Sequence, residues 1–265
     1  MRTAASSRDE QEQPQLEQSV YEVESRVEAG HWWFTGRRRL LADVISGLDL
    51  PKDCRVLDVG SGTGTNLRLL GELGFIDFSG VDKSESAIHF CAEKSLGTVE
   101  LGDACALPCD DRSIDLLIAT DIVEHVEDDA AALREFRRVL RPGGRVILTV
   151  PAFPSLWGLQ DEVSHHVRRY RKSDFEARIR TAGLGLVTSF HFNYLLFAPI
   201  WLARQLIRIL RIDLASENQL NTSILNALLA RIFAFDVSTA PRLRPAFGVS
   251  IFALGERAAL RLVGE

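Results

Sequence analysis

Hydrophobic positions follow two different periods along residues 53–192. Short apolar runs rich in β-branched residues recur, and most are followed by a longer stretch whose apolar residues have helical spacing. We assign strands to Arg55–Val59, Phe78–Val81, Thr98–Leu101, Ile114–Ala119 and Arg145–Val150. We assign helices to Asn66–Leu73, Ser86–Lys94 and Asp129–Leu140. Strands that alternate with helices in this way predict an α/β fold with a doubly wound, mostly parallel sheet.

The pattern changes after Pro151. Ser173–Ala182 has helical spacing, with Ser173 as the expected N-cap and Gly183 just past the helix end. Leu186–Phe192 and Val249–Gly255 have the pattern of strands, and residues 194–236 between them are apolar with helical spacing. The sequence therefore predicts a helical insertion, residues 194–247, before the last strand.

Charge and composition exclude several classes of protein. The 265 residues include 31 basic and 36 acidic side chains, which gives a net charge of −5, and 46% are hydrophobic. These values are typical of a folded globular protein and predict no nucleic-acid partner, which usually requires a basic surface. The four cysteines lack zinc-finger spacing and the N-terminus lacks the apolar core of a signal peptide. We therefore expect a cytoplasmic protein with free thiols.

The chain is expected to have two parts of unequal size. Residues 1–30 carry three basic and seven acidic side chains. We interpret them as an acidic, flexible N-terminal tail, because too little of this segment is apolar to form a core. Residues 31–265 are predicted to form a single domain.

The most informative segment is Val56–Gly64, VLDVGSGTG, in which an apolar strand and three alternate glycines precede a helix. Glycines allow positive φ and the close approach of a ligand, and a helix start presents free N–H groups. The spacing is G-x-G-x-G rather than the G-x-G-x-x-G of dinucleotide-binding turns, and Asp58 precedes the first glycine by two residues. A carboxylate at this point suits a cationic or zwitterionic ligand better than a pyrophosphate.

Two further acids end successive strands. Asp82 comes 18 residues after Gly64, at a position from which a carboxylate can accept both hydroxyls of a ribose. Asp103 follows the third strand and can accept from an exocyclic amine such as that of adenine. Acids at three successive strand ends predict a nucleoside-binding edge of the sheet.

These motifs resemble those of the class I S-adenosylmethionine-dependent methyltransferases. LDVGSGTG is similar to the first motif of that family, GVDKS to the second, GDACALP to the third, DLLIATDIVEHVED to the fourth and VLRPGGRVILTVP to the late helix–strand motif. The likeness covers about residues 31–192 and the closing strand near 249–255, and is strongest to enzymes that act on small molecules, lipids and quinones. It implies a Rossmann-like sheet of seven strands, in which an antiparallel last strand pairs with Leu186–Phe192. It also implies S-adenosyl-L-methionine as the cofactor.

The resemblance assigns the cofactor to the carboxyl ends of these strands. The glycine-rich turn would surround the methionine part, and the second and third strand ends would hold the ribose and the adenine. The implied cofactor-binding residues are Asp58, Gly60, Ser61, Gly62, Thr63, Gly64, Asp82, Lys83, Asp103, Ala104, Thr120 and Asp121. Related enzymes often place an aromatic and basic helix before the first strand, here His31–Arg39. We expect Arg37 or Arg38 of this helix to pair with the methionine carboxylate.

Candidate catalytic residues follow the fourth and fifth strands. Methyl transfer from a sulfonium requires an aligned acceptor, and a base where the acceptor is a hydroxyl or an ammonium. We expect His125, after the fourth strand, and His166 and Tyr170, in the next long loop, to act on that proton. In some quinone O-methyltransferases an acid-x-x-Glu-His motif supplies a divalent metal. Asp121, Glu124 and His125 match this motif with a shorter first acid, so we predict no metal and keep this site as the alternative.

The helical insertion is expected to be a lid over the acceptor. Residues 190–265 carry eight basic and five acidic side chains. Arg204, Arg208 and Arg211 share one face of the expected helix Pro199–Ile212, beside apolar residues, a pattern typical of an interfacial helix. We therefore expect a small-molecule or lipid-linked acceptor and peripheral contact with a membrane. Packing on the sheet or a homodimer is the alternative.

Two other functions fit the motifs less well. An NAD(P)-dependent oxidoreductase has a similar sheet, but the G-x-G-x-G spacing and the acid after the third strand argue against it. A non-catalytic S-adenosylmethionine-binding module is the other alternative, and His125 and the polar loop 161–170 argue against it. The sequence does not separate O-, N- and C-methylation.

Overall fold

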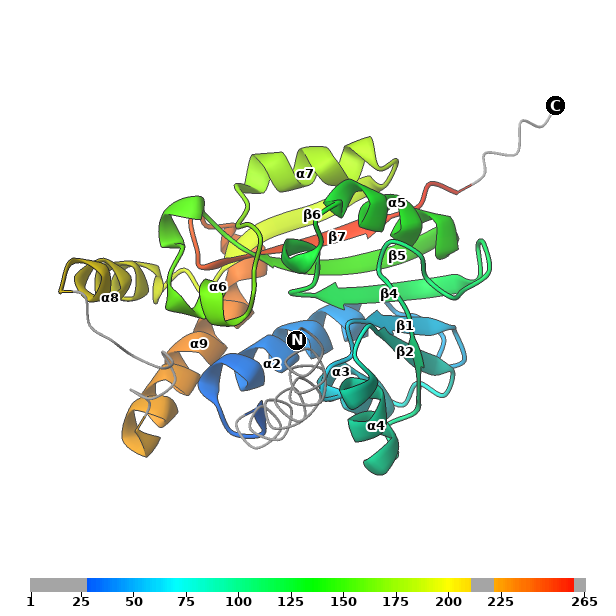
Figure 1. Ribbon diagram of the computed structural model, residues 1–265, viewed down its shortest axis with the longest axis horizontal. Coiled ribbons are helices and arrows are strands. Elements are labelled where there is room, and N and C mark those ends of the chain that lie inside the picture. The colour runs from blue at the N-terminus through cyan, green and yellow to red at the C-terminus, as the bar shows by residue number, and fades with distance from the viewer. Residues whose placement is uncertain (1–27, 211–221, 260–265) are drawn as a thin grey trace, which may run out of the picture.

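The sheet of this protein is doubly wound, and helices cover both of its faces (Figure 1). The structure is a computed structural model that describes residues 28–210 and 222–259. In these residues seven strands form one sheet with the order β3-β2-β1-β4-β5-β7-β6. The strands are β1 Val56–Val59, β2 Phe78–Asp82, β3 Thr98–Leu101, β4 Ile114–Thr120, β5 Leu140–Pro151, β6 Gly185–Phe192 and β7 Ser250–Glu256. The first five are parallel, and β7 is antiparallel to both β5 and β6, which confirms the expected sheet.

Helices of two groups pack on opposite faces of the sheet. One group consists of α2 Trp32–Gly47, α3 Thr65–Glu72 and α9 Ser223–Leu243, and the other of α5 Asp129–Val139 and α7 Lys172–Thr181. The remaining helical segments are α4 Glu85–Glu93, η1 Val123–His125, η2 Pro154–Leu156, α6 Leu159–Val163 and α8 Phe197–Leu210. The two groups give the molecule two hydrophobic cores, one on each side of the sheet.

The central strands supply both cores because their side chains alternate between the two faces. On β4, Leu117 packs in the core under α5 and α7, while Leu116 and Ile118 pack in the core under α2 and α9. On β7, Ala253 packs in the core under α5 and α7, and Phe252 packs in the core under α2 and α9. A strand buried on both faces has a continuous apolar run, as in LLIA of IDLLIA and VIL of RVILTV in the sequence.

Helix ends differ from expectation at two places. Helix α7 begins at Lys172 with Arg171 as its N-cap, so the assignment of Ser173 as N-cap is wrong, and the Ser173 hydroxyl instead bonds Asp174 at 3.1 Å. The expected stop after α7 is confirmed, because Gly183 has a φ of +82°. Strand β5 begins at Leu140, earlier than expected, because the segment after α5 pairs with β4 through a register shift.

The insertion before β7 is partly built into the core. Phe233 of α9 is fully buried, and the ring of Trp33 from α2 stacks on it at 5.2 Å between ring centroids. Gly36 makes this approach possible, since a Cβ there would lie 2.2 Å from the Phe233 ring. Asp236 of α9 accepts bonds from the backbone N–H groups of Asn193 and Leu195, at 2.7 and 2.8 Å. The second half of the insertion is therefore fixed to the sheet.

Parts of the chain lie outside the described residues. These are residues 1–27 of the predicted tail, residues 211–221 of the predicted insertion, including Arg211, and residues 260–265. Glu28, which we assigned to the tail, is described and is only 4% exposed. Its carbonyl oxygen accepts a bond of 2.7 Å from Arg38 of α2.

Candidate functional site

The glycine-rich turn after β1 holds backbone conformations that other residues disfavour. Gly60, Gly62 and Gly64 have φ values of +75°, +50° and +78°. The space beside the turn is also tight: a Cβ on Gly60 would lie 2.0 Å from the Ile122 side chain, and one on Gly64 would lie 2.5 Å from Leu96. The alternation of glycines that marked this segment in the sequence thus has a steric cause.

A buried polar network connects the turn with β4. Asp58 is fully buried, and Asn66 of α3 donates to its Oδ1 at 2.9 Å and to the Thr120 hydroxyl at 3.1 Å. Burial raises the pKa of Asp58 to about 6, although hydrogen bonds from Asn66 and Ser61 oppose the shift. The Oδ2 atom of Asp58 has no hydrogen-bond partner among the described residues. A buried carboxylate oxygen without a partner favours a cationic or hydrogen-bond-donating ligand at this point.

Asp82 is held firmly at the end of β2. Its Oδ2 accepts from the Gly62 N–H at 2.8 Å and its Oδ1 from the Ser84 N–H at 2.9 Å. The side chain therefore connects the glycine-rich turn to the start of α4. Lys83, the next residue, is exposed.

The end of β3 is more open to solvent. Asp103 is exposed and its Oδ1 accepts from the Cys105 N–H at 2.7 Å, which closes a short turn around the half-buried Ala104. Asp82 and Asp103 both lie at the carboxyl edge of adjacent parallel strands, because Asp82 pairs in register with Leu101.

Arg37 and Arg38 face different parts of the molecule. Arg37 pairs with Asp121 at the end of β4, and its Nε atom is buried without a hydrogen-bond partner among the described residues. Asp121 has a φ of +56° and also accepts from the Thr149 hydroxyl at 3.0 Å. Arg38 bonds the carbonyl of Glu28 instead. Of the two arginines that the sequence left open, Arg37 is the one in the site.

Glu28 and Asn66 also belong to this region, but the sequence alone did not identify them as site residues. The Glu28 carboxylate accepts from the hydroxyls of Thr63 and Thr65, in and just after the glycine-rich turn. Glu28 lies in a segment with seven acids, and no local pattern separates it from the other six. Asn66 sits inside the expected helix, where its spacing alone gave no signal.

Three side chains with lone pairs meet beyond the end of β4. The carboxylate and imidazole atoms of Glu124, His125 and His166 that could ligate an ion all lie within 4.8 Å of one another. The two imidazole rings meet edge to face with centroids 4.7 Å apart, and His166 Nε2 lies 4.0 Å from Glu124 Oε1. Glu124 is fully buried, and neither of its carboxylate oxygens has a hydrogen-bond partner among the described residues. The structure therefore brings together His125 and His166, which the sequence placed in separate loops.

Burial shifts the pKa values of two members of this cluster towards their neutral forms. Burial, together with the neighbouring His166, lowers the pKa of His125 to about 4. Burial likewise raises the pKa of Glu124 well above the ordinary range, and the charge on Asp121 adds to the effect. The imidazole of His125 is therefore neutral at pH 7 and keeps a lone pair for a ligand.

His166 is oriented by a buried carboxylate. Its Nδ1 lies 2.8 Å from Asp161 Oδ1, and Arg169 binds both oxygens of Asp161 at 2.9 and 3.0 Å. Burial tends to raise the pKa of Asp161, but the bonds and charges of His166, Arg169 and Arg204 lower it. Arg204, which we grouped with Arg208 and Arg211 on one face of an interfacial helix, lies against Leu156 and Asp161 with a side chain that is 9% exposed. It therefore does not belong to an exposed basic face, because the loop after β5 offers it a buried acid.

Tyr170 does not share this cluster. Its ring is buried, and its hydroxyl donates to Asp129 Oδ2 at 2.8 Å. Burial and the adjacent Asp129 raise its pKa far above the ordinary value, so the hydroxyl keeps its proton. Tyr170 therefore belongs to the packing around the N-terminus of α5. We no longer propose it as a proton-transfer group.

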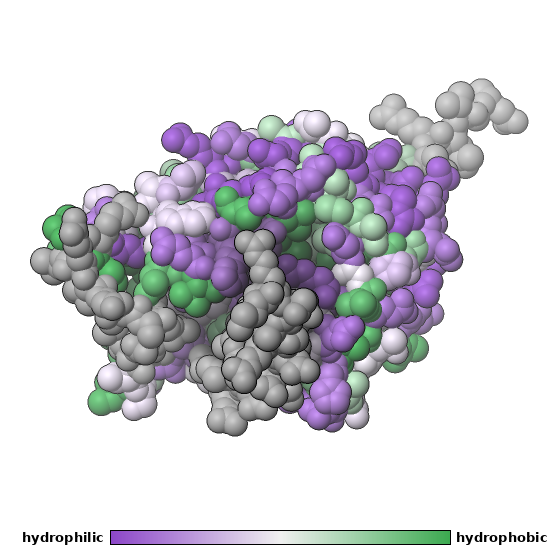
Figure 2. All heavy atoms as spheres, in the orientation of Figure 1, coloured by the Kyte–Doolittle hydropathy of each residue, from purple (hydrophilic) through white to green (hydrophobic). Residues whose placement is uncertain are grey.

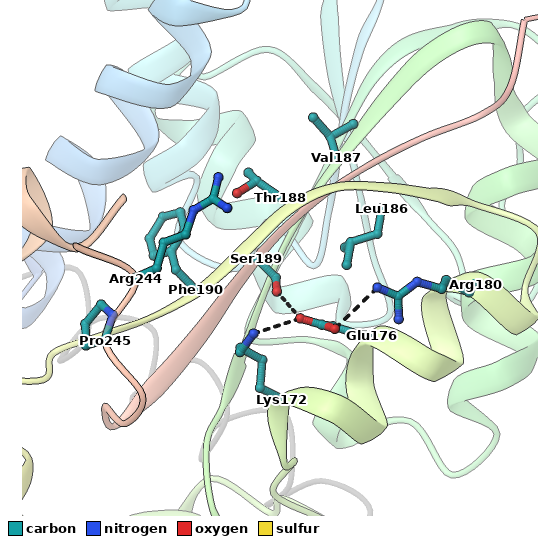
Figure 3. A pocket seen from close by; sticks show the side chains of 10 residues that line it. All are labelled: Lys172, Glu176, Arg180, Leu186, Val187, Thr188, Ser189, Phe190, Arg244 and Pro245. Atoms are coloured by element: carbon teal, nitrogen blue, oxygen red, sulfur yellow. Dashed lines mark hydrogen bonds and ion pairs between the residues drawn. The ribbon is translucent and has the colours of Figure 1, made fainter. Parts of the chain in front are cut away.

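A separate cavity of about 240 Å³ opens on the outer edge of the sheet (Figure 3). It lies between β6, α7 and the end of α9, and Glu176 at its centre binds Lys172 at 2.9 Å, Arg180 at 3.3 Å and the Ser189 hydroxyl. Because its lining comes from the middle of β6 and not from strand ends, it is distinct from the site described above.

Comparison with known proteins assigns the strand-end site to a family. Residues 57–148 match the family model described as a methyltransferase domain. These residues of the chain form a methyltransferase domain. This agrees with the family resemblance of the motifs and with the strand order of the sheet.

The relatives of this methyltransferase domain include enzymes for small molecules. Phosphoethanolamine N-methyltransferase 3 of Arabidopsis thaliana is 31% identical over 120 residues, covering 43% of this chain and 24% of the relative. Demethylmenaquinone methyltransferase of Staphylococcus aureus (strain MRSA252) is 33% identical over 137 residues, covering 46% of this chain and 54% of the relative. The matched segments thus span between a quarter and about half of these curated relatives.

A solved structure shares the fold of the methyltransferase domain. Phosphoethanolamine N-methyltransferase 2 of Haemonchus contortus, in complex with S-adenosyl-L-methionine, superposes with a TM-score of 0.55 at 19% identity. The superposition covers 83% of this chain and 52% of that one. This likeness establishes the architecture of the domain, and the chemistry must come from the residues of the site.

Proposed function

We propose that this protein transfers the methyl group of S-adenosyl-L-methionine to a small-molecule acceptor. The observation that carries the proposal is that two buried atoms of opposite charge, Asp58 Oδ2 and Arg37 Nε, have no hydrogen-bond partner within residues 28–210 and 222–259. The two side chains are close enough to interact electrostatically. The methionine end of the cofactor carries an ammonium and a carboxylate, which match these two atoms in charge. A pyrophosphate would bring negative charge towards the buried Asp58, which argues against a dinucleotide.

The residues of the strand ends fit the rest of the cofactor. Gly60, Gly62 and Gly64 have no side chains that would obstruct the approach of a ligand to the turn. Asp82 offers a carboxylate for the ribose. Asp103 and Ala104 lie where the adenine is expected. Thr120 and Asp121 form the floor at the end of β4. Bound cofactor supplies an electrophilic methyl group, and the protein aligns the acceptor and excludes water from it. His125 and His166 lie where they can take up a proton from the acceptor.

Calorimetry tests the cofactor assignment directly. We expect the purified full chain to bind S-adenosylhomocysteine and S-adenosyl-L-methionine and not NAD. Binding of NAD without S-adenosylhomocysteine would refute the proposal and favour the oxidoreductase alternative. Binding of both methionine-derived ligands without methyl transfer to any small-molecule acceptor would favour a non-catalytic module.

Removing the carboxylate of Asp82 is expected to weaken cofactor binding. Asp82→Ala should weaken S-adenosylhomocysteine binding by roughly 1–3 kcal/mol, the usual result of leaving buried polar groups without partners. Asp82→Asn keeps the shape but cannot accept from both the Gly62 and Ser84 N–H groups and the ribose, so we expect an intermediate loss. Titration calorimetry of the three proteins measures the effect. Equal affinities in all three would place the ribose elsewhere.

We further propose that the acceptor is associated with a membrane. Hydrophobic surface is visible at the left of the molecule in Figure 2. Exposed apolar side chains on and beside α8 and α9 are Trp201, Leu202, Leu206, Ile209, Ile224, Leu225, Leu228, Phe235, Leu243 and Phe247. Helix α9 is long and apolar enough to cross a membrane, but its Phe233 and Val237 pack in the protein core. Exposed Arg231, Arg242 and Arg244 lie on or next to the same helix. We therefore favour contact with an anionic lipid surface over a membrane span.

Replacing apolar residues of α8 tests this contact. We expect the protein to sediment with phosphatidylglycerol vesicles and Leu202→Glu/Leu206→Glu to lower the bound fraction by roughly tenfold, because two side chains lose burial in lipid. Ile76→Glu is the matched control, since Ile76 is 76% exposed but lies between α3 and β2. If the wild type stays in solution and sedimentation velocity shows a dimer that the double variant breaks, the apolar surface is a homodimer interface instead.

A further inference from the structure

We infer that Glu124, His125 and His166 form a binding site for a divalent first-row transition metal such as zinc. The set differs from the acid-x-x-Glu-His alternative considered from the sequence, because the third ligand comes from the loop after β5. Only the use of this metal in catalysis rests on the proposed methyl transfer, while metal binding itself is independent of it.

The distances among the three groups suit one shared ion. Zinc binds imidazole nitrogen and carboxylate oxygen at about 2.0–2.2 Å, so two of its ligand atoms stand at most about 4.4 Å apart. The ligand atoms here lie within 4.8 Å of one another, and His166 Nε2 is 4.0 Å from Glu124 Oε1. Small side-chain shifts therefore bring all three into contact with one ion.

The buried carboxylate is the independent sign of a cation. Glu124 has no exposed surface, and both of its oxygens lack hydrogen-bond partners among the described residues. Burying a carboxylate without a partner is strongly unfavourable, and such groups in folded proteins are paired or coordinate a metal. Its neighbours include the imidazoles of His125 and His166, and imidazoles are metal ligands when neutral.

The surroundings of His166 match those of a metal-bound histidine. Its Nδ1 faces Asp161 Oδ1 at 2.8 Å, which leaves Nε2 directed towards Glu124. Metal-ligating histidines commonly donate their second ring nitrogen to a carboxylate, which fixes the tautomer. Asp161 is itself fixed by both contacts to Arg169, so the ring is oriented before any ion binds.

Asp121 does not belong to this ligand set. Its two oxygens are already engaged by Arg37 and by the Thr149 hydroxyl. Replacing an oxygen ligand by a second imidazole also changes the preferred ion. Magnesium prefers oxygen ligands alone, whereas two histidines with one glutamate suit zinc, cobalt or iron(II).

Three protein ligands leave one coordination position open. The cluster lies beyond the end of β4, next to the strand ends that we assign to the cofactor. If the acceptor carries a hydroxyl, its oxygen can take this position and release its proton to solvent more readily. The methyl–sulfur bond then breaks as the methyl–oxygen bond forms. In this form of the reaction His125 and His166 act as ligands and not as proton acceptors.

Cobalt titration of the chelator-treated full chain tests the site. We expect one Co²⁺ per chain with visible d–d absorption, and displacement of the Co²⁺ by Zn²⁺. Glu124→Gln and His166→Ala should each weaken Co²⁺ binding by about tenfold or more, whereas His89→Ala should bind as the wild type does. His89 is the matched control because it pairs with Glu93 at 3.1 Å on the exposed face of α4. X-ray absorption of the Co²⁺-loaded wild type should show two imidazole ligands, a result that needs no variant to fold.

Several outcomes would overturn the site. These are the absence of stoichiometric Co²⁺ in the wild type, affinity that survives both ligand substitutions, or a spectrum without imidazole. Magnesium that binds more tightly than cobalt and is lost in Asp121→Asn would assign the metal to the acid-x-x-Glu-His set instead. S-adenosylhomocysteine binding, measured on the same samples, separates the two proposals: its retention without metal binding refutes only the metal site.

Discussion

Gly60→Ala is expected to weaken S-adenosylhomocysteine binding by at least about tenfold, or about 1.4 kcal/mol. Gly60 has a φ of +75°, which costs a residue with a side chain about 1–3 kcal/mol. The new Cβ would also lie 2.0 Å from Ile122 Cδ1, so the turn or the start of η1 must move. Because the Gly60 N–H bonds the carbonyl of Val81 at 2.7 Å, this movement reaches the end of β2. Titration calorimetry measures the loss.

Gly74→Ala is the matched control, because it separates the backbone strain of a positive φ from a steric clash of the new Cβ with its neighbours. Gly74 has a similar φ of +82°, but a Cβ there meets nothing within 4 Å. We expect this variant to lose some stability and to keep its affinity for S-adenosylhomocysteine. Wild-type affinity in Gly60→Ala would contradict the assignment of this turn to the cofactor.

Asp129→Ala is expected to lower the free energy of unfolding by about 3–5 kcal/mol. Asp129 is 2% exposed and lies in the first turn of α5. Its carboxylate pairs with Arg168 at 2.9 Å and Arg178 at 2.6 Å, and accepts from the Tyr170 hydroxyl at 2.8 Å. The substitution leaves these groups without their acceptor beneath α5 and α7. Urea unfolding followed by circular dichroism measures the change.

Glu93→Ala is the matched control for this loss. The carboxylate of Glu93 also contacts a basic residue, with Oε1 3.1 Å from His89 Nε2, but the Glu93 side chain is 61% exposed, so we expect a change below about 0.5 kcal/mol. A loss of less than about 1 kcal/mol in Asp129→Ala would show that solvent can replace the partners of this carboxylate and that the region is not held by it.

Most of the sheet could be predicted because burial on both faces leaves a local pattern. IDLLIA and RVILTV contain the consecutive apolar residues LLIA and VIL, and β4 and β5 include these segments. The antiparallel last strand came from the family resemblance and is confirmed by the pairing of β7 with β5 and β6. The N-cap of α7 could not be found in this way, because Arg171 caps with its backbone conformation and its side chain makes no capping bond.

The candidate site was predictable where backbone shape required a particular residue type. Gly60, Gly62 and Gly64 stand out in the sequence because all three have positive φ, and Gly60 and Gly64 also have close neighbours that exclude other side chains. Pairings between polar groups that are far apart in the sequence leave no comparable local pattern. Arg204 was taken for a surface cation because helical spacing shows only which residues share a face, and not that Asp161 lies beneath that face.

By itself, the sequence determined the alternation of strands and helices, the glycine-rich turn and the acids at three strand ends, because each depends on residues close together in the chain. Tertiary structure alone decided that Glu28 contacts the glycine-rich turn, that Arg37 rather than Arg38 reaches Asp121, and that His166 meets Glu124 and His125. These contacts join segments 35 to 84 residues apart or different loops. Their partners are set by how the sheet brings its strand ends to one edge, and no local spacing records that arrangement.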